Sequence, residues 1–533
     1  MPKNSLRIEV LGASIPISAE EEKDYLDRLL ADYKKAIEDT QKATGLEDPL
    51  KIAILTGFLL YDEAEKLRAA LTERPLTQEP DGNDEAESLT MSLISRLDAV
   101  LKEPPAGGHT GTGERTGTGG HTGAGHLTHS LKNPIKHYDW GSPEWIPSLL
   151  GETNPTGEPW AEMWMGVHPE GPSLIEDTDG RGGLPLSAFI GRSPLYCLGK
   201  ETLDTFGGLP FLFKTLAAAK PLSIQAHPNQ DQARDGFERE NAAGIDIKAA
   251  NRNYKDPNHK PEIICALTPF TAMCGFRTPD EIRRLLEDFS AYAPSSLKAG
   301  LASLSGALFA MDGENPLKSF LEAVFGMNEK TRQDLTEYVH AFQIEKHNPL
   351  FQGEYRLVSQ FARLYPGDPA IISPLYLNVL RLKPGEAMFL PSGALHAYVY
   401  GFGIELMANS DNVLRGGLTR KNVDIKELCR ILKFSPFKPL TIKAGEKPLS
   451  RYNSPAREFS LSYLEGELLY KEPGPSIVLV GSGELLVSDG DGKDIHYKKG
   501  SSLFVPAEAG RNGIWFKGNF SGYAASSGLF RDI

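Results

Sequence analysis

The sequence predicts a mainly β protein, with a helical insertion inside its β-rich part and a separate α+β region at the N-terminus. Three observations support this. After about residue 130 the chain consists of short apolar runs punctuated by Gly and Pro, which is typical of strands. Residues 276–372 change to helical periodicity. A Gly-, Thr- and His-rich segment, 103–129, separates these parts from the N-terminal region, and 533 residues suggest three or four domains.

The composition excludes several classes of partner and location. A net charge of -13 disfavours general nucleic-acid binding, so an anionic substrate would need a local cluster of Lys and Arg. No apolar stretch approaches the roughly 20 residues that cross a bilayer, and "MPKNSLRIEVLG" lacks the pattern of a secretory signal. The four cysteines are scattered, which favours reduced thiols. We therefore expect a cytoplasmic protein that binds neither nucleic acid nor membrane.

The N-terminal region begins with a predicted β-hairpin and helix. In "LRIEVLGASIPIS" apolar and polar residues alternate on both sides of Gly12. Ser18 and Glu21 have the spacing of a capping box and predict the start of the helix. The apolar face of that helix comprises Leu26, Leu29, Leu30, Tyr33 and Ile37.

Two further helices are predicted over residues 50–71 and 87–103. The first is apolar all round at its start, which indicates a buried and oligomeric surface. Together with the hairpin, the series through "DPLKIAILTGFLLYDEAEKL" resembles ZapA-type bacterial cell-division proteins over about residues 5–101. The resemblance implies self-association into a homo-oligomer and binding to a tubulin-like division GTPase. The alternative is an oligomerisation cap with no division partner.

Residues 103–129 form a predicted flexible tether between residues 1–102 and the rest of the chain. The segment is mostly Gly, Thr and His and contains almost nothing to bury. Its four histidines are His109, His121, His126 and His129. A linker is favoured over a metal site, because a structural zinc site needs cysteines or a folded frame.

Two polar pairs at strand spacing are candidate metal ligands. Gln225 and His227 in "PLSIQAHPNQ", and Lys260 and Glu262 in "HKPE", are two residues apart and share a face if extended. Further on, "GEAMFLPSGALH" has the form G-x5-P-x-G-x2-H and delivers His396 onto a strand. This pattern is typical of cupins, jelly-roll barrels that hold a metal inside the barrel. Gln225, His227, Glu262 and His396 suit one zinc ion per chain.

The chain from about residue 130 to its end resembles type I mannose-6-phosphate isomerases. The resemblance rests on "HYDWGS", "EPWAEMWMGVHPEGPS", "LPFLFKTLAAAKPLSIQAHPNQ", "DPNHKPEIICALTPFTAMCGFR" and "PSGALHAYVYGFGIELMANSDNVLRGGLTRK". It implies that zinc is bound by the same four residues. It also implies reversible conversion of mannose 6-phosphate to fructose 6-phosphate.

That reaction needs a proton-transfer group and a phosphate site. The candidates for proton transfer through an enediol are Glu405, Lys260 and His259, with Asp411 as an alternative, and the sequence does not choose among them. Arg415 is the best candidate for the phosphate, because its planar guanidinium suits phosphate oxygens. Lys421, Lys214 and Ser223 are possible helpers, and Trp140 and Glu162 match family motifs at the edge of the pocket.

The expected architecture is two cupin barrels with a helical insertion. Residues 130–275 and 373–440 form the catalytic barrel, and 276–372 form the insertion, with Ile282, Leu285, Leu286 and Phe289 on one helix face. Residues 441–533 form a second barrel. Gly500 and Pro506 repeat the turn there, but Ala507–Gly510 replace the histidine, so this barrel is expected to bind no metal.

Two other functional classes compete with the isomerase. A metal-dependent oxygenase of the cupin type would normally show H-x-H where this chain has Q-x-H. A non-catalytic adaptor of cell division that senses a sugar phosphate is the stronger competitor. The intact set of four ligand residues argues against the adaptor.

Overall fold

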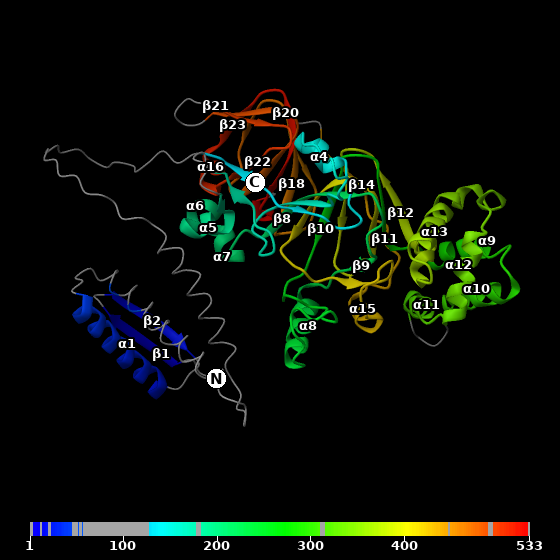
Figure 1. Ribbon diagram of the computed structural model, residues 1–533, viewed down its shortest axis with the longest axis horizontal. Helices are drawn as coiled ribbons and strands as arrows, with labels where there is room; N and C mark the ends of the chain where they lie inside the picture. The colour runs from blue at the N-terminus through cyan, green and yellow to red at the C-terminus, as the bar shows by residue number, and fades with distance from the viewer. Residues whose placement is uncertain are drawn as a thin grey trace. The chain divides into compact units, whose positions relative to one another are not determined.

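The computed structural model describes residues 4–10, 13–19, 23–44, 52, 56, 127–176, 183–309, 315–445, 448–488 and 494–530. The chain divides into two compact units, Met1–Gly117 and Thr118–Ile533. Figure 1 shows the elements of each unit. Within the described residues, no helix has the length and apolar character needed to cross a membrane. All four cysteines lie in the described residues and are free thiols, as predicted.

The first unit contains the predicted hairpin and helix. Strands β1 (Asn4–Val10) and β2 (Ala13–Ala19) are antiparallel, with Leu6 opposite Ile17 and Val10 opposite Ala13 at the tight turn. Helix α1 (Lys23–Thr44) packs along this hairpin (Figure 1). Ile37, on the predicted apolar face, is buried. The hairpin and the helix are therefore confirmed.

The predicted start of α1 is wrong. Ser18 lies in β2 opposite Ser5, and the helix begins at Lys23, so Ser18 is not its N-cap. Strand pairing of the apolar residues Ile15 and Ile17 extends β2 through Ser18 and outweighs its local capping preference. The helices predicted over 50–71 and 87–103 lie outside the described residues, except Ile52 and Thr56, which are helical and buried.

The second unit is mainly β, and its first sheet has eleven antiparallel strands. The longest, β14, pairs with β9 and β11 at its start and with β8 and β10 at its end, so it joins two parts of the sheet. The strands are β4 (Ile135–Lys136), β5 (Glu162–Met165), β8 (Phe211–Ala218), β9 (Gln225–Ala226), β10 (Glu262–Ala266), β11 (Phe270–Phe276), β12 (Leu377–Leu382), β13 (Glu386–Leu390), β14 (His396–Ala408), β15 (Leu414–Arg415) and β16 (Ile442–Lys443).

The second sheet also has eleven antiparallel strands. They are β3 (His129–Lys132), β6 (Leu174–Ile175), β7 (Leu184–Pro185), β17 (Leu449–Tyr452), β18 (Ser460–Glu465), β19 (Leu468–Tyr470), β20 (Ser476–Ser488), β21 (Asp494–Lys498), β22 (Ser502–Val505), β23 (Ile514–Lys517) and β24 (Phe520–Ser526).

One apolar core joins the two sheets. Phe213, Ile263 and Ile404 of the first sheet share this core with Ile477 and Phe504 of the second. Because side chains alternate along a strand, the neighbours of these residues on β8, β10 and β14 point to the opposite face of the first sheet. Lys214, Glu262 and Glu405 lie buried on that opposite face, which we call the polar face. Farther along the same strands this face also carries a smaller apolar cluster that includes Leu216 and Ile264.

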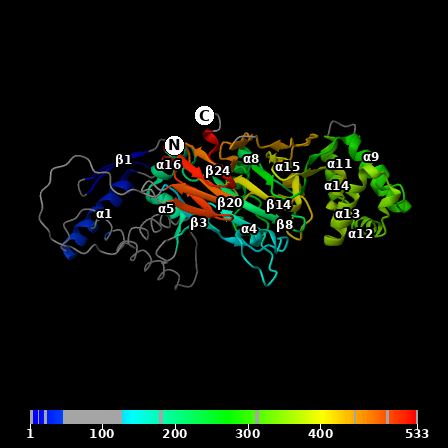
Figure 2. The ribbon, with the colours of Figure 1, turned by 90° about the horizontal axis from the view of Figure 1, so that it is seen from above.

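Helices α9 to α14 stand between β11 and β12 in the sequence and share an apolar core with β9, β11, β14 and β15 of the first sheet. Helix α9 begins with a capping box of Thr278 and Glu281 and buries the four predicted residues, which confirms the predicted helix. Figures 1 and 2 show these helices at one end of the second unit, with the first sheet between them and the second sheet. They are α9 (Pro279–Phe289), α10 (Ser295–Ala307), α11 (Pro316–Phe325), α12 (Glu329–His340), α13 (Gln352–Leu364) and α14 (Ser373–Tyr376).

The remaining helices are short, apart from α8, and connect or flank strands. They are α4 (Trp145–Leu150), α5 (Leu186–Arg192), α6 (Pro194–Leu198), α7 (Lys200–Phe206), α8 (Gln230–Ala242), α15 (Ile425–Ile431) and α16 (Ala507–Asn512), with 3-10 turns η1 (Ile344–Lys346), η2 (Pro349–Phe351), η3 (Pro369–Ile372) and η4 (Gly528–Phe530). Helix α16 follows β22 after the single residue Pro506.

The predicted linker extends too far. His129 belongs to β3 and pairs with Phe504, and the Thr128 hydroxyl is 2.9 Å from the Tyr497 hydroxyl. These contacts belong to the folded second unit, so a linker ends before residue 127. No local pattern indicates these contacts, because the partners of Thr128 and His129 stand near the other end of the chain. Residues 103–126 lie outside the described residues.

The turn that delivers His396 depends on Gly393, and a prediction follows from its geometry. Gly393 has φ 78°, and a Cβ there would lie 2.8 Å from the Ile431 carbonyl oxygen. Gly385 has φ 82°, with open space where a Cβ would be. We expect Gly385→Ala to cost about 1 kcal/mol of unfolding free energy and Gly393→Ala about 1 to 3 kcal/mol more, because it adds a clash. Urea denaturation measures both. Equal losses would contradict the steric role of Gly393.

Candidate functional site

Three strands bring the four candidate ligand residues together on the polar face of the first sheet. Gln225 on β9 is paired with His396 at the start of β14. Glu262 opens β10 and lies between Leu390 of β13 and Met407 of β14. The Gly393 N–H donates to the His227 carbonyl at 2.8 Å, which ties the turn before β14 to the segment after β9.

The side chains form a compact buried cluster. His227 Nε2 is 3.4 Å from Glu262 Oε1, and His396 Nε2 is 3.4 Å from Glu262 Oε2. One ligand atom from each of these three residues lies within 4.8 Å of the others. The Gln225 amide is 3.4 Å from His396 Nε2. Since the oxygen and nitrogen of an amide are assigned and not seen, either amide atom can face the cluster.

The two histidines present lone pairs to this cluster. His227 Nδ1 lies 2.7 Å from the Asn412 carbonyl and His396 Nδ1 lies 2.9 Å from the Ala394 carbonyl. A carbonyl oxygen only accepts hydrogen bonds, so each Nδ1 carries the hydrogen. The lone pair of each Nε2 is then free to bind a metal. Within the described residues, His227 Nε2 and Glu262 Oε2 have no hydrogen-bond partner although both are buried. Such orphaned atoms, converging on one point, fit a zinc ion.

Electrostatics favour the protonation states that a metal needs. Burial lowers the pKa of His227 to about 4, and Lys260 contributes in the same direction, so the ring is neutral near pH 7. Burial alone would raise the pKa of Glu262, but His227 and Lys260 outweigh it and hold that pKa well below its usual value. Lys260 Nζ is 3.3 Å from Glu262 Oε1. The cluster therefore contains a carboxylate and, at His227, a neutral imidazole.

A buried ion pair adjoins the ligand cluster on the same face. Lys214 Nζ is 3.1 Å from Glu405 Oε2 and 3.9 Å from Glu162 Oε2. The Trp164 indole N–H donates to Glu162 at 2.6 Å. Burial opposes the charge of Lys214, but Glu162 and Glu405 raise its pKa overall. Burial raises the pKa of Glu405.

A group of cations lies beside β9. Arg415 on β15 is paired with Gln225, and within the described residues it has no ion pair with an acid. Burial lowers its pKa. Burial, Arg415 and Lys255 lower the pKa of Lys421, so Arg415 and Lys255 each lie near Lys421. Local positive charge of this kind, with no acid paired to Arg415 in the described residues, favours an anionic ligand.

The loop from Arg415 to Lys421 is held in a strained conformation. Leu418 has φ 52°, the left-handed region that side chains other than glycine rarely adopt. Its N–H donates to Asp368 Oδ2 at 2.7 Å, and Asp368 lies directly before η3. The segment between α13 and α14 thus fixes the loop between two of the cations.

Of the other predicted site residues, Lys214 departs from the expectation that it helps to bind the phosphate. Lys214 is bound to two carboxylates and does not join Arg415. His259 Nε2 is 2.7 Å from Glu458 Oε1, a residue between β17 and β18. Asp411 is 3.3 Å from His168. Trp140 stacks on Tyr138 beside the polar face, and Ser223 is half-buried, two residues before Gln225.

Sequence reasoning missed three residues of this region. Lys255 and Asp368 carry no local signal, because they act on a loop that is distant in the chain. His168 stands inside the motif "EPWAEMWMGVHPEGPS", so the motif itself was a usable signal. Its partner Asp411 is 243 residues distant.

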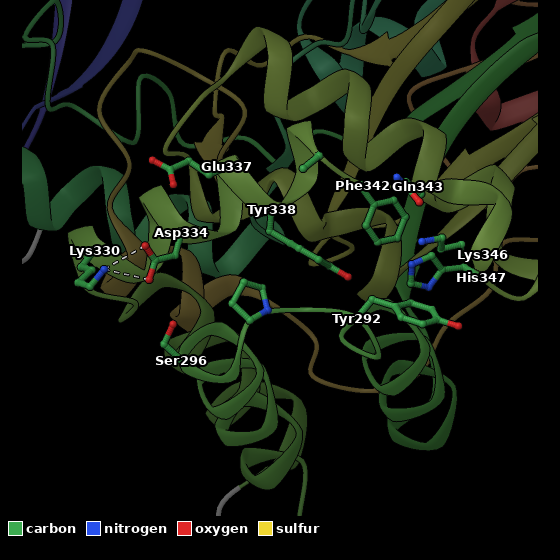
Figure 3. A pocket seen from close by; sticks show the side chains of 12 residues that line it. Tyr292, Ser296, Lys330, Asp334, Glu337, Tyr338, Phe342, Gln343, Lys346 and His347 are labelled. Atoms are coloured by element: carbon green, nitrogen blue, oxygen red, sulfur yellow. Dashed lines mark hydrogen bonds and ion pairs between the residues drawn. The ribbon is translucent and has the colours of Figure 1, made fainter.

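A separate pocket of about 530 Å³ lies among the helices. Figure 3 shows Tyr292, Phe342, Lys346 and His347 around one part of it and Lys330 paired with Asp334 at another. The charges of its lysines and acids balance, and it lies away from the ligand cluster in the chain and the fold. We therefore place the chemistry at the polar face of the first sheet and not in this pocket.

A buried cluster of two histidines and a carboxylate, next to free cationic charge and held by antiparallel sheets, defines a metal-dependent enzyme with an anionic ligand. Comparison with known proteins identifies the family. Residues 128–279 match the family model of the phosphomannose isomerase type I catalytic domain, and residues 6–100 match that of the cell division protein ZapA.

The relatives cover most of the second unit. The chain is 38% identical to mannose-6-phosphate isomerase of Escherichia coli over 384 residues, 71% of this chain and 94% of that protein. It is 33% identical to the Homo sapiens protein, over 71% and 93% of the two chains. A crystal structure of mannose 6-phosphate isomerase from Salmonella typhimurium bound to substrate and zinc has a TM-score of 0.66 at 35% identity, and covers 75% of this chain and 99% of that one. The chain belongs to the mannose-6-phosphate isomerase family.

The buried Lys214 yields a test of the charge balance in this site. We expect Lys214→Met to lower the unfolding free energy by about 3 to 5 kcal/mol, because it leaves Glu405 and Glu162 close together without a counter-charge. Lys200→Met is the matched control, since Lys200 is exposed and pairs with Asp204 on α7, where the loss of stability should be much smaller. Urea denaturation gives both values. Similar losses of stability in the two variants would show that Lys214 does not compensate the buried charges of Glu405 and Glu162.

Proposed function

We propose that this chain is a zinc-dependent isomerase that interconverts mannose 6-phosphate and fructose 6-phosphate. The observation that carries the proposal is the convergence of His227 Nε2, His396 Nε2 and the Glu262 carboxylate in a buried site. The family relationship supports the reaction, and the related Salmonella typhimurium structure contains both substrate and zinc.

Gln225, His227, Glu262 and His396 are the residues that would hold the zinc. The ion, when bound, supplies Lewis-acid stabilisation of negative charge on the sugar oxygens. The Nδ1 hydrogen bonds to Asn412 and Ala394 keep both imidazoles in the required orientation. Lys260 holds Glu262 ionised through its 3.3 Å contact.

Arg415, Lys421 and Ser223 would bind the phosphate group. Arg415 has no acidic partner within the described residues, so its guanidinium is available for a bidentate contact with phosphate oxygens. Lys255 adds positive charge to the same region. Binding energy from the phosphate then positions the reacting carbons.

The proton moves between adjacent carbons of the open-chain sugar through an enediol, so the transferring group must touch the sugar. Glu405, Lys260 and Asp411 remain the candidates. Asp411 has the most accessible carboxylate, with 46% of its side chain exposed, whereas Glu405 is buried and bound to Lys214. His259 is the weakest candidate, because Glu458 holds its Nε2.

The barrel architecture and the domain limits are part of the proposal. The first sheet, with the turn at Gly393 before His396, supports a catalytic cupin barrel built mainly from 130–275 and 373–440. These limits need correction at three places, because β3 pairs with β22 of the second sheet, β6 and β7 continue that sheet, and β16 pairs with β13 of the first sheet. Residues 276–372 form the insertion and 441–533 a second barrel without metal. In that barrel α16 occupies the place of the histidine turn. From the contacts of Thr128 and His129, the catalytic part begins by residue 127.

The N-terminal region would serve self-association and binding to a tubulin-like division GTPase. The ZapA family model over residues 6–100 supports this role, as do the hairpin and α1. A sugar-phosphate-sensing adaptor without catalysis is the alternative. The intact ligand cluster favours the isomerase.

His396→Ala and Gln225→Ala test the zinc site. Each should lower bound zinc and isomerase activity together by at least about tenfold, since even the loss of an outer partner of a metal ligand costs about tenfold to a hundredfold. Elemental analysis and a coupled assay for fructose 6-phosphate measure the two effects. Arg415→Ala is the control, and it should keep its zinc while losing about tenfold to a hundredfold in kcat/KM. Normal turnover by metal-free His396→Ala would overturn the assignment.

Removal of residues 1–117 tests the division of labour between the two units. The shortened chain should keep near-full isomerase activity, because every proposed ligand lies in Thr118–Ile533. It should also have a smaller oligomeric mass in light scattering. A chain starting at Ser130 is an informative comparison, since it lacks Thr128 and His129 and should be less stable. Unchanged mass after the deletion would remove the self-association role, and lost activity would show that the N-terminal region completes the site.

A further inference from the structure

His168 is a buried histidine that the zinc and phosphate sites do not use. It lies in the loop after β5, which Ser173 closes: the Gly166 N–H donates to Ser173 Oγ at 2.9 Å, and the Ser173 N–H donates to the Gly166 carbonyl at 2.8 Å. The Gly171 N–H donates to the His168 carbonyl at 3.0 Å. The backbone of His168 is thus held by the loop itself.

The loop also determines which ring nitrogen of His168 carries the hydrogen. The Glu170 backbone N–H donates to His168 Nδ1 at 3.2 Å. A backbone N–H only donates, so Nδ1 must supply a lone pair and the ring hydrogen must lie on Nε2. Nε2 is 3.3 Å from Asp411 Oδ1. The edge contact with Trp164, with ring centroids 4.7 Å apart, limits rotation of the imidazole.

Asp411 receives this hydrogen bond at the border of the proposed active site. Its own N–H donates to Asp256 Oδ2 at 2.7 Å, which fixes its backbone. The next residue, Asn412, accepts from His227 Nδ1 through its carbonyl. The hydrogen bond from His168 is the largest cause that lowers the pKa of Asp411, and Lys260 and Lys255 act in the same direction. Nearly half of the Asp411 side chain is exposed. His168 therefore binds Oδ1, while the rest of the carboxylate is accessible to a ligand.

We propose that His168 is a positioning residue for the isomerisation, which holds Asp411 through Nε2–H on Oδ1 and leaves the second carboxylate oxygen directed to the sugar. The Glu170 backbone N–H orients the His168 ring, and the His168 ring in turn orients the Asp411 carboxylate. The inference rests on the proposed isomerase function. It adds that His168 and Asp411 act as one unit, with no direct contact between His168 and the substrate.

A double-mutant cycle on the full-length, zinc-loaded protein tests this. The variants are His168→Phe, which keeps a ring against Trp164 but removes the donor, Asp411→Asn, and the two combined. His168→Gln restores an N–H at a similar reach. His496→Phe is the matched control, because His496 is also 3.2 Å from a carboxylate, that of Glu484, but lies on β21 of the second sheet. Zinc content and the thermal midpoint are measured for every variant.

We expect His168→Phe to lower kcat on the order of tenfold to a hundredfold with zinc content unchanged, as for the loss of a hydrogen bond to a charged group. His168→Gln should recover most of that loss, and His496→Phe should match the wild type. In the Asp411→Asn background, His168→Phe should have little further effect, because residues that act as a unit are not additive.

Two results would overturn the proposal. If the effects of His168→Phe and Asp411→Asn multiply, or if His168→Gln is as impaired as His168→Phe, the histidine acts independently of Asp411 or only supports the loop. If the wild-type protein itself fails to isomerise mannose 6-phosphate, the proposed function fails and this inference fails with it. If the wild-type protein is active but the effects of the two substitutions are independent, the isomerase assignment stands. Only the proposed role of His168 is then rejected.

Discussion

Glu262 has 1% of its side chain exposed, and the need to compensate this buried charge determines the arrangement of the site. A carboxylate taken out of water costs several kcal/mol unless charged or hydrogen-bonding groups surround it. Here His227, His396 and Lys260 converge on it. Within the described residues, His227 Nε2 and Glu262 Oε2 have no hydrogen-bond partner. A divalent cation would bind both atoms. The same residues would therefore serve metal binding and the stability of the fold.

The sheet makes that arrangement possible through the alternation of its strands. One face of β8, β10 and β14 is apolar and packs against the second sheet, so the other face is available for charges. The same alternation places the Lys214–Glu405 pair near Glu262. The loop from Arg415 to Lys421 is fixed from outside the sheet, by Asp368 beside the helices. The helical segment therefore contributes to the proposed phosphate site by constraining strained backbone at Leu418.

Local patterns predict much of this arrangement. The i, i+2 spacing of Gln225 and His227 follows from strand periodicity, and Gly393 before His396 follows from turn chemistry, so local patterns are enough to name these ligand residues. Ser18 was misplaced because pairing with Ser5 outweighs a capping signal. His168, Lys255, Thr128 and His129 were missed or misplaced because their partners are distant in sequence, and no local pattern encodes such contacts. The sequence does not identify the proton-transfer group either, because its contacts are also with residues that are distant in the chain.

The most direct test of the account is a coupled assay for fructose 6-phosphate formation from mannose 6-phosphate by the full-length chain. The assay is run on the protein as purified, after removal of metal by a chelator, and after zinc is added back. We predict activity that is lost with the chelator and restored by about one equivalent of zinc per chain, consistent with a single cluster of ligands. Full activity after complete removal of metal, or no activity with zinc bound, would contradict the account.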